Sequence, residues 1–77
     1  MKIKVKLFAS LREALGYAER DMEVYDGQTL HEVWKQITGD AAQSGEVLMA
    51  INMDYANPEA IVKDGDEVAF FPPVTGG

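Results

Sequence analysis

The residues best suited to chemistry in this 77-residue chain stand at its C-terminal end, Pro72-Pro73-Val74-Thr75-Gly76-Gly77. The two prolines fix φ and favour an extended segment that projects from whatever precedes it. The two glycines lack Cβ atoms, so their backbone can enter a narrow slot without steric conflict. This pattern predicts that the main-chain carboxylate of Gly77 is presented to another protein. The simpler alternative is a frayed terminus, because a pair of final glycines also arises by chance.

A carboxylate is a poor electrophile and is usually activated by attack on the α-phosphate of ATP, which gives an acyl-adenylate. The chain contains neither GxxxxGK[ST] nor GxGxxG, so it offers no nucleotide-binding motif of its own. It has no cysteine and a single histidine, His31, which excludes thiol chemistry and argues against a histidine-rich metal site. We therefore expect a carrier that is not an enzyme on its own, that binds no cofactor or metal, and whose activating partner uses ATP.

Composition narrows the class of protein further. Hydrophobic residues make up 47% and charged residues 26%, which predicts one globular domain over residues 1–77. The net charge of −6 argues against nucleic acid and anionic membranes as partners. The longest fully apolar run, 47–51, is too short to span a bilayer, and the alternating N-terminus lacks the apolar stretch of a signal peptide. The predicted location is the cytoplasm.

Two elements are predicted in the first 16 residues. Apolar residues alternate with lysines over 2–8, which is typical of a half-buried strand, and Phe8 falls on the lysine side. Ser10 and Glu13 have the spacing of a capping box, so a short helix is expected over 11–15, ended by the glycine that follows.

A second strand and the main helix are expected next. Polar and apolar residues alternate over 21–25, and Asp26-Gly27 ends that strand with turn chemistry. Thr29 and Glu32 form a second capping-box pattern, which opens a helix that stops at Gly39. The apolar stripe of this helix carries Leu30, Val33, Trp34 and Ile37, and Trp34 is its expected anchor in the core.

The second half of the chain reads as a loop and strands. A polar loop over 40–46 precedes an apolar strand over 47–53, a brief extended piece over 60–62 and a last strand over 67–71, where two prolines end the pairing. Short strands around one main helix predict an α+β fold, a mixed sheet with the helix packed on one face.

The other face of that sheet is expected to carry a docking site. If Val68 and Phe70 face the helix, then Phe71 lies on the opposite face with Phe8, because side chains alternate along a strand. Two exposed aromatics on one surface favour a protein-binding patch, which Tyr55 would extend. The alternative is that these are scattered surface residues with no shared role.

Two segments carry a resemblance to a known family. They read Phe-Ala-Ser-Leu-Arg-Glu at 8–13 and Asp-Gly-Asp-Glu-Val-Ala-Phe-Phe-Pro-Pro-Val-Thr-Gly-Gly at 64–77. The chain resembles the small, sulfur-carrier subunits of molybdopterin synthase, which are β-grasp proteins of the ubiquitin-like superfamily. The last fourteen residues are the specific part of this resemblance.

The resemblance implies a mechanism and partners. A ubiquitin-activating-like adenylyltransferase would adenylate the carboxylate of Gly77, and sulfur transfer would convert it to a thiocarboxylate. Residues 72–76 would then insert into the large catalytic subunit of the synthase, where the sulfur goes to cyclic pyranopterin monophosphate to build the dithiolene. The family also implies a heterotetramer, with two small subunits at opposite ends of a large-subunit dimer.

Other functions remain open at this point. Sulfur carriers for thiamine, cysteine or tRNA thiolation share the fold and the Gly-Gly end. A ubiquitin-like modifier would use the same acyl-adenylate but would attach Gly77 to lysines of target proteins. A binding domain without any carrier chemistry is the third alternative.

Overall fold

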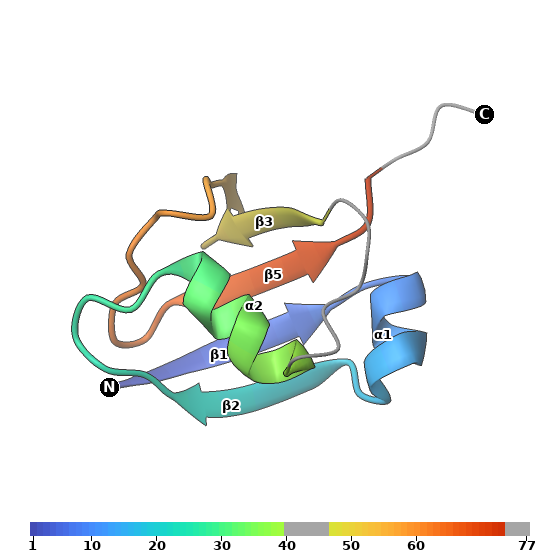
Figure 1. The fold of residues 1–77 in the computed structure, drawn as a ribbon, viewed down its shortest axis with the longest axis horizontal. Coiled ribbons are helices and arrows are strands. Elements are labelled where there is room, and N and C mark those ends of the chain that lie inside the picture. Colours follow the sequence, from blue (N-terminus) through green and yellow to red (C-terminus); the bar gives the residue numbers. More distant parts are fainter. Residues whose placement is uncertain (40–46, 74–77) are drawn as a thin grey trace.

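The computed structural model describes residues 1–39 and 47–73, and it contains a mixed five-stranded sheet and two helices (Figure 1). The strands lie in the order β2-β1-β5-β3-β4; β1 and β5 are parallel, and the other neighbours are antiparallel. The bounds in chain order are β1 Lys2–Leu7, α1 Ser10–Leu15, β2 Glu19–Glu23, α2 Leu30–Thr38, β3 Leu48–Ile51, β4 Asp54–Tyr55 and β5 Glu67–Phe71. The predicted α+β class is confirmed.

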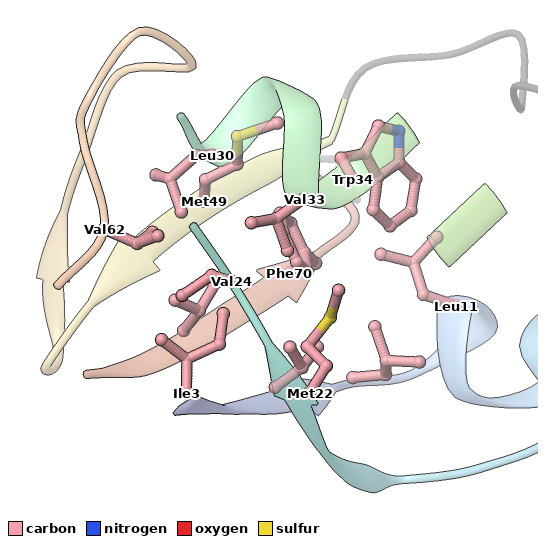
Figure 2. Packing of buried hydrophobic residues seen from close by; sticks show 13 residues of the cluster. Ile3, Leu11, Met22, Val24, Leu30, Val33, Trp34, Met49, Val62 and Phe70 are labelled. Atoms are coloured by element: carbon pink, nitrogen blue, oxygen red, sulfur yellow. The ribbon is translucent and has the colours of Figure 1, made fainter. Parts of the chain in front are cut away.

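Helix α2 crosses one face of the sheet and closes the core against it (Figures 1 and 2). The ring of Trp34 lies 4.9 Å, centroid to centroid, from that of Phe70 on β5, so the helix is anchored on the central strands. The predicted role of Trp34 is confirmed. The buried side chains of this cluster are Ile3, Val5, Leu7, Leu11, Met22, Val24, Leu30, Val33, Trp34, Met49, Val62, Val68 and Phe70.

The start of α2 follows its sequence signals. The amide of Glu32 donates to Thr29 Oγ1 at 3.2 Å, and the amide of Thr29 donates to Glu32 Oε1 at 3.0 Å, which completes the predicted capping box. The helix ends at Thr38, and the amide of Gly39 donates to the carbonyl of Lys35 at 2.7 Å. Helix α2 therefore occupies the range that its apolar stripe predicted.

Helix α1 begins differently from the prediction. Its N-cap is Ala9, no side chain caps it, and Ser10 is its first helical residue, so the capping box predicted at Ser10 is wrong. A backbone turn replaces the side-chain cap, since the amide of Leu11 donates to the carbonyl of Phe8 at 3.2 Å. The predicted stop is confirmed, because Gly16 is left-handed with φ 84°.

The second strand lies earlier than predicted. It covers Glu19–Glu23 rather than 21–25, because it pairs with β1 from Lys6↔Glu19 to Lys2↔Glu23. As an edge strand it buries only Met22 among its five residues, so its polar start shows no apolar alternation. Val24 is buried, but it lies beyond the end of the ladder.

The predicted strand over 47–53 is also too long. Strand β3 ends at Ile51, and Asn52 and Met53 form a tight turn into the two-residue strand β4, which the sequence did not reveal. The piece over 60–62 contributes a single bridge, Thr29↔Ile61. The predicted loop over 40–46 lies outside the described residues. Among the residues described, no helix is long and apolar enough to cross a membrane.

Candidate functional site: an aromatic surface beside the tail

Strand β5 divides its side chains between the two faces of the sheet. Val68 and Phe70 are fully buried under α2, whereas Ala69 and Phe71 point to the opposite face, as the alternation predicted. Both helices contribute buried side chains to the first face, including Leu11 from α1. The second face, away from α2, is therefore the one on which this chain leaves an apolar surface for other contacts.

Three aromatic residues from three different segments meet on that face. The ring of Phe8, which follows β1, packs edge-on against Phe71 at 6.4 Å, and the ring of Tyr55 on β4 lies 5.8 Å from Phe71. The side chains of Phe8 and Tyr55 are 47% and 79% exposed, so neither belongs to the buried core. The structure thus brings together the three residues that the sequence singled out, although their binding role stays a prediction.

A depression of about 340 Å³ lies among these aromatics. Ala50 and Ala69, which pair across β3 and β5, contribute the smallest side chains of its lining. The lining comprises Lys6, Phe8, Ala50, Met53, Tyr55, Glu67, Ala69 and Phe71. We refer to these eight residues as the open face.

Charge on the open face is balanced and local. Lys6 Nζ lies 3.1 Å from a carboxylate oxygen of Glu67, and both side chains are partly exposed. Such a pair adds little stability, about 0–1 kcal/mol, because water screens it. It gives the apolar surface a polar border, which is the usual arrangement of a protein interface.

Sequence reasoning missed five residues of the open face. Lys6 lies two residues before Phe8, and Glu67 and Ala69 lie four and two residues before Phe71. Because alternate residues of a strand share one face, the sequence alone could have placed all three on this face. Ala50 depends on the register between β3 and β5, and Met53 depends on a turn at the end of β3. No local pattern reports either of those two features.

The tail that could carry the chemistry begins directly after the open face. Phe71 ends β5, and Pro72 and Pro73 follow it as partly buried residues without regular structure. Val74, Thr75, Gly76 and Gly77 lie outside the described residues, so the predicted projection of this segment stays a prediction. Across residues 1–39 and 47–73 no group of three or more acidic, histidine or cysteine side chains could hold a metal ion, and His31 is exposed on α2.

The fold defines the class of protein first. A mixed sheet in the order β2-β1-β5-β3-β4 with one helix across it is the ubiquitin-like β-grasp fold, as the resemblance implied. The structure is similar to that of SAMP1 from Haloferax volcanii, with a TM-score of 0.82 and 26% sequence identity over the full length of both chains.

The chain belongs to the ThiS family, whose sequence profile matches residues 5–77. It is 41% identical to the molybdopterin synthase sulfur carrier subunit of Haemophilus influenzae, over 97% of this chain and 99% of that one. It is 37% identical to the protein of the same name from Chlamydomonas reinhardtii, over the full length of both. The resemblance found in the sequence is thereby confirmed.

Proposed function

We propose that this chain is a sulfur carrier of molybdopterin synthase and that its reactive group is the C-terminal carboxylate of Gly77. The observation that carries the proposal is the match along the whole chain to relatives named as sulfur carrier subunits of that enzyme. The absence of cysteine agrees with it, because sulfur carried on the main-chain terminus needs no thiol in the carrier. The chain supplies sulfur to the enzyme complex and performs no catalysis alone.

The chemistry proceeds in two steps on the same carbon atom. A carboxylate oxygen of Gly77 attacks the α-phosphate of ATP in an adenylyltransferase partner, and pyrophosphate leaves. Hydrosulfide-level sulfur from the sulfur source then attacks the acyl carbon, its proton goes to solvent, AMP leaves, and the terminus becomes a thiocarboxylate. This chain contributes the carboxylate, and the partner contributes the nucleotide site, since no nucleotide-binding motif stands in this sequence.

Delivery of the sulfur requires the large catalytic subunit. Residues 72–76 lead Gly77 into its active site, where the sulfur passes to cyclic pyranopterin monophosphate. The four residues after Pro73 span at most about 14 Å when extended, so the protein that holds Gly77 must lie close to the end of β5. The aromatic part of the open face, Phe8, Tyr55 and Phe71, stands at that end of the strand. Aromatic residues are among the types that dominate binding energy in protein interfaces.

The remaining partner assignments follow from the same proposal. Two carriers bind at opposite ends of a large-subunit dimer and form a heterotetramer in the cytoplasm. The carrier itself binds no cofactor or metal. Its negative charge disfavours nucleic acid and membrane surfaces, and it suits partners with basic patches.

Deletion of Gly77 tests the carrier chemistry. The truncated chain is expected to unfold at the same temperature as the intact chain, because no member of the described core cluster follows Phe70 in the chain. It should give no pterin dithiolene when it is combined with the activating enzyme, the sulfur source, the large subunit and the precursor pterin. Normal product formation by the truncated chain would overturn the proposal.

A protein modifier is the second candidate function. Two similarities favour it: the structure is similar to SAMP1, and a relative 28% identical to this chain is named small archaeal modifier protein 3. Intact-mass measurement on protein isolated from its native cells separates the two functions. Exchange of one terminal oxygen for sulfur supports the carrier, whereas isopeptide adducts through Gly77 support the modifier.

A further inference from the structure

This chain places glycine at the positions where its backbone is left-handed. All four glycines in the described ranges have a positive φ, between 65° and 90°. Only three other described residues share that sign: Ala9 at 54°, Asn52 at 50° and Met53 at 72°. Asparagine tolerates this region, whereas a residue such as methionine is strained there. Met53 is thus an exception to the chain's own pattern.

The side chain of Met53 does nothing for the core. It is 90% exposed, more than any other large hydrophobic residue in the described ranges. It lines the depression of the open face together with Tyr55 and Phe8. A strained backbone therefore displays an apolar side chain to solvent on the surface where the aromatics gather, and strain of this kind concentrates at functional sites.

The turn that carries Met53 is held firmly. The amide of Asn52 donates to the carbonyl of Glu67 at 2.7 Å, and the amide of Glu67 donates back to Asn52 Oδ1 at 3.0 Å. Asn52 Nδ2 also donates to Asp66 Oδ1 at 3.0 Å. Because three hydrogen bonds fix the turn to the start of β5, Met53 stands at a defined place beside the depression.

We propose that Met53 is a contact residue for the large synthase subunit and that the fold keeps it in a left-handed turn at the expense of stability; this inference rests on the proposed function. The occupant is an apolar patch of that subunit, which covers Phe71 beside the tail and extends across the depression to Met53. The short reach from Pro73 to Gly77 requires that subunit to lie beside Phe71 at the C-terminal end of β5. The depression continues from there along the strand to Met53, which lies beside the start of β5. Methionine suits such a contact because its unbranched thioether adapts to an irregular surface.

A second copy of this chain is a poorer occupant. Each copy carries a net charge of −6, so two copies repel one another when their open faces meet. The charges within the open face are already paired between Lys6 and Glu67, and they offer no compensating contact across a two-fold axis. A partner with a basic surface around an apolar centre lacks this repulsion.

The test compares stability and binding in the variant Met53→Gly. The free energy gained by relieving the left-handed strain exceeds the entropic cost of ordering a glycine on folding. The unfolding temperature should therefore rise by about 2–5 °C. Affinity for the large subunit, measured by calorimetry with the subunit from the same organism, should fall roughly fivefold. Opposite changes in stability and affinity are the signature of a contact residue that is kept under strain.

Two further variants serve as controls. Met53→Leu keeps both the apolar side chain and the strain, so affinity and unfolding temperature should stay close to those of the unmodified chain. Ile61→Asn removes an exposed apolar side chain that does not line the open face, so affinity should not change.

Each contrary result has a separate meaning. Unchanged affinity in Met53→Gly, alongside weakened binding by Phe71→Ala, would overturn the role of Met53 and leave the carrier function intact. A lower unfolding temperature in Met53→Gly would overturn the claim of strain. If the unmodified chain failed to bind the large subunit, the proposed function and this inference would both fail. Sedimentation that shows a dimer dissociated by Met53→Gly would assign the open face to a second copy.

Discussion

Phe70 and Phe71 are adjacent on β5, yet they belong to two different surfaces of the sheet. Phe70 is completely buried against Trp34, whereas Phe71 lies on the open face between Phe8 and Tyr55. The same residue type therefore serves the stability of the fold on one face, and on the other it stands in the surface that we propose for contact with the large subunit. A small chain has room for one core, so the second face of its sheet is free to evolve as a binding surface.

The two faces also differ in how their backbone is built. We call the side of the sheet that packs against α2 the covered face. There, helix α2 starts at a complete capping box, and the alternation of side chains along the strands supplies the buried residues. On the open face, Met53 has a positive φ of 72° without being glycine. Local preference and final structure agree at the start of α2, and they disagree at Met53 on the open face. Such disagreements are expected at functional sites.

Phe70→Ala should have the largest effect on stability. Truncation of a fully buried phenylalanine costs about 3–5 kcal/mol, a large part of the roughly 4–12 kcal/mol expected for a domain of this size. We expect urea unfolding to show a greatly destabilised or unfolded protein. A loss below about 1 kcal/mol would show that the covered face does not carry the stability of the fold.

Phe71→Ala is the matched variant on the other face. Loss of its edge-on and tilted ring contacts should cost about 1–3 kcal/mol of stability, less than Phe70→Ala, since the ring is only partly buried. Affinity for the large subunit should fall roughly thirtyfold, as for an interface residue worth about 2 kcal/mol. Phe8→Ala should weaken binding less, by about fivefold, because among the described residues the ring of Phe8 packs on one other ring, whereas that of Phe71 packs on two. Unchanged affinity in both variants would remove the open face from the binding mechanism.

The sequence predicted the covered face well because one physical signal defines it. Ile3, Val5 and Leu7 alternate on a strand, and Leu30, Val33 and Trp34 follow a helical period, so burial of one face dictates both patterns. Strand β2 was displaced in the prediction since an edge strand with a single buried residue has no such period.

The open face was predictable only in part. Parity placed Phe8 and Phe71 on one side of the sheet, but the approach of Tyr55 depends on the turn at Asn52 and Met53. That turn contains a methionine where glycine would have signalled it, so the apolar run looked like a continuous strand. The projection and chemistry of residues 74–77 stay predictions, because these residues lie outside the described ranges.

The smallest expected effect lies at the edge of the covered face, where α2 begins. The side chain of Glu32 accepts hydrogen bonds from the Tyr25 hydroxyl and from the Thr29 amide, and both lower the pKa of this carboxyl from its ordinary value of 4.5. A carboxyl whose pKa is lower in the folded chain stabilises the fold above its unfolded pKa. That contribution is lost as the pH falls through the folded value.

The difference in unfolding temperature between Glu32→Gln and the unmodified chain should therefore become smaller as the pH is lowered. The unfolding temperatures should differ slightly at pH 7 and converge as the pH falls below about 4.5, where the ionised carboxylate is lost from the unmodified chain as well. The stability lost in Phe70→Ala should be the same at pH 5 and pH 7, because none of the buried side chains of the described core cluster is ionisable. A difference for Glu32→Gln that stays constant from pH 7 to pH 3 would show that the carboxylate charge contributes nothing at this helix start. The covered face would then depend on apolar burial even at its exposed border, and its contrast with the open face, where Met53 has a strained backbone, would be sharper still.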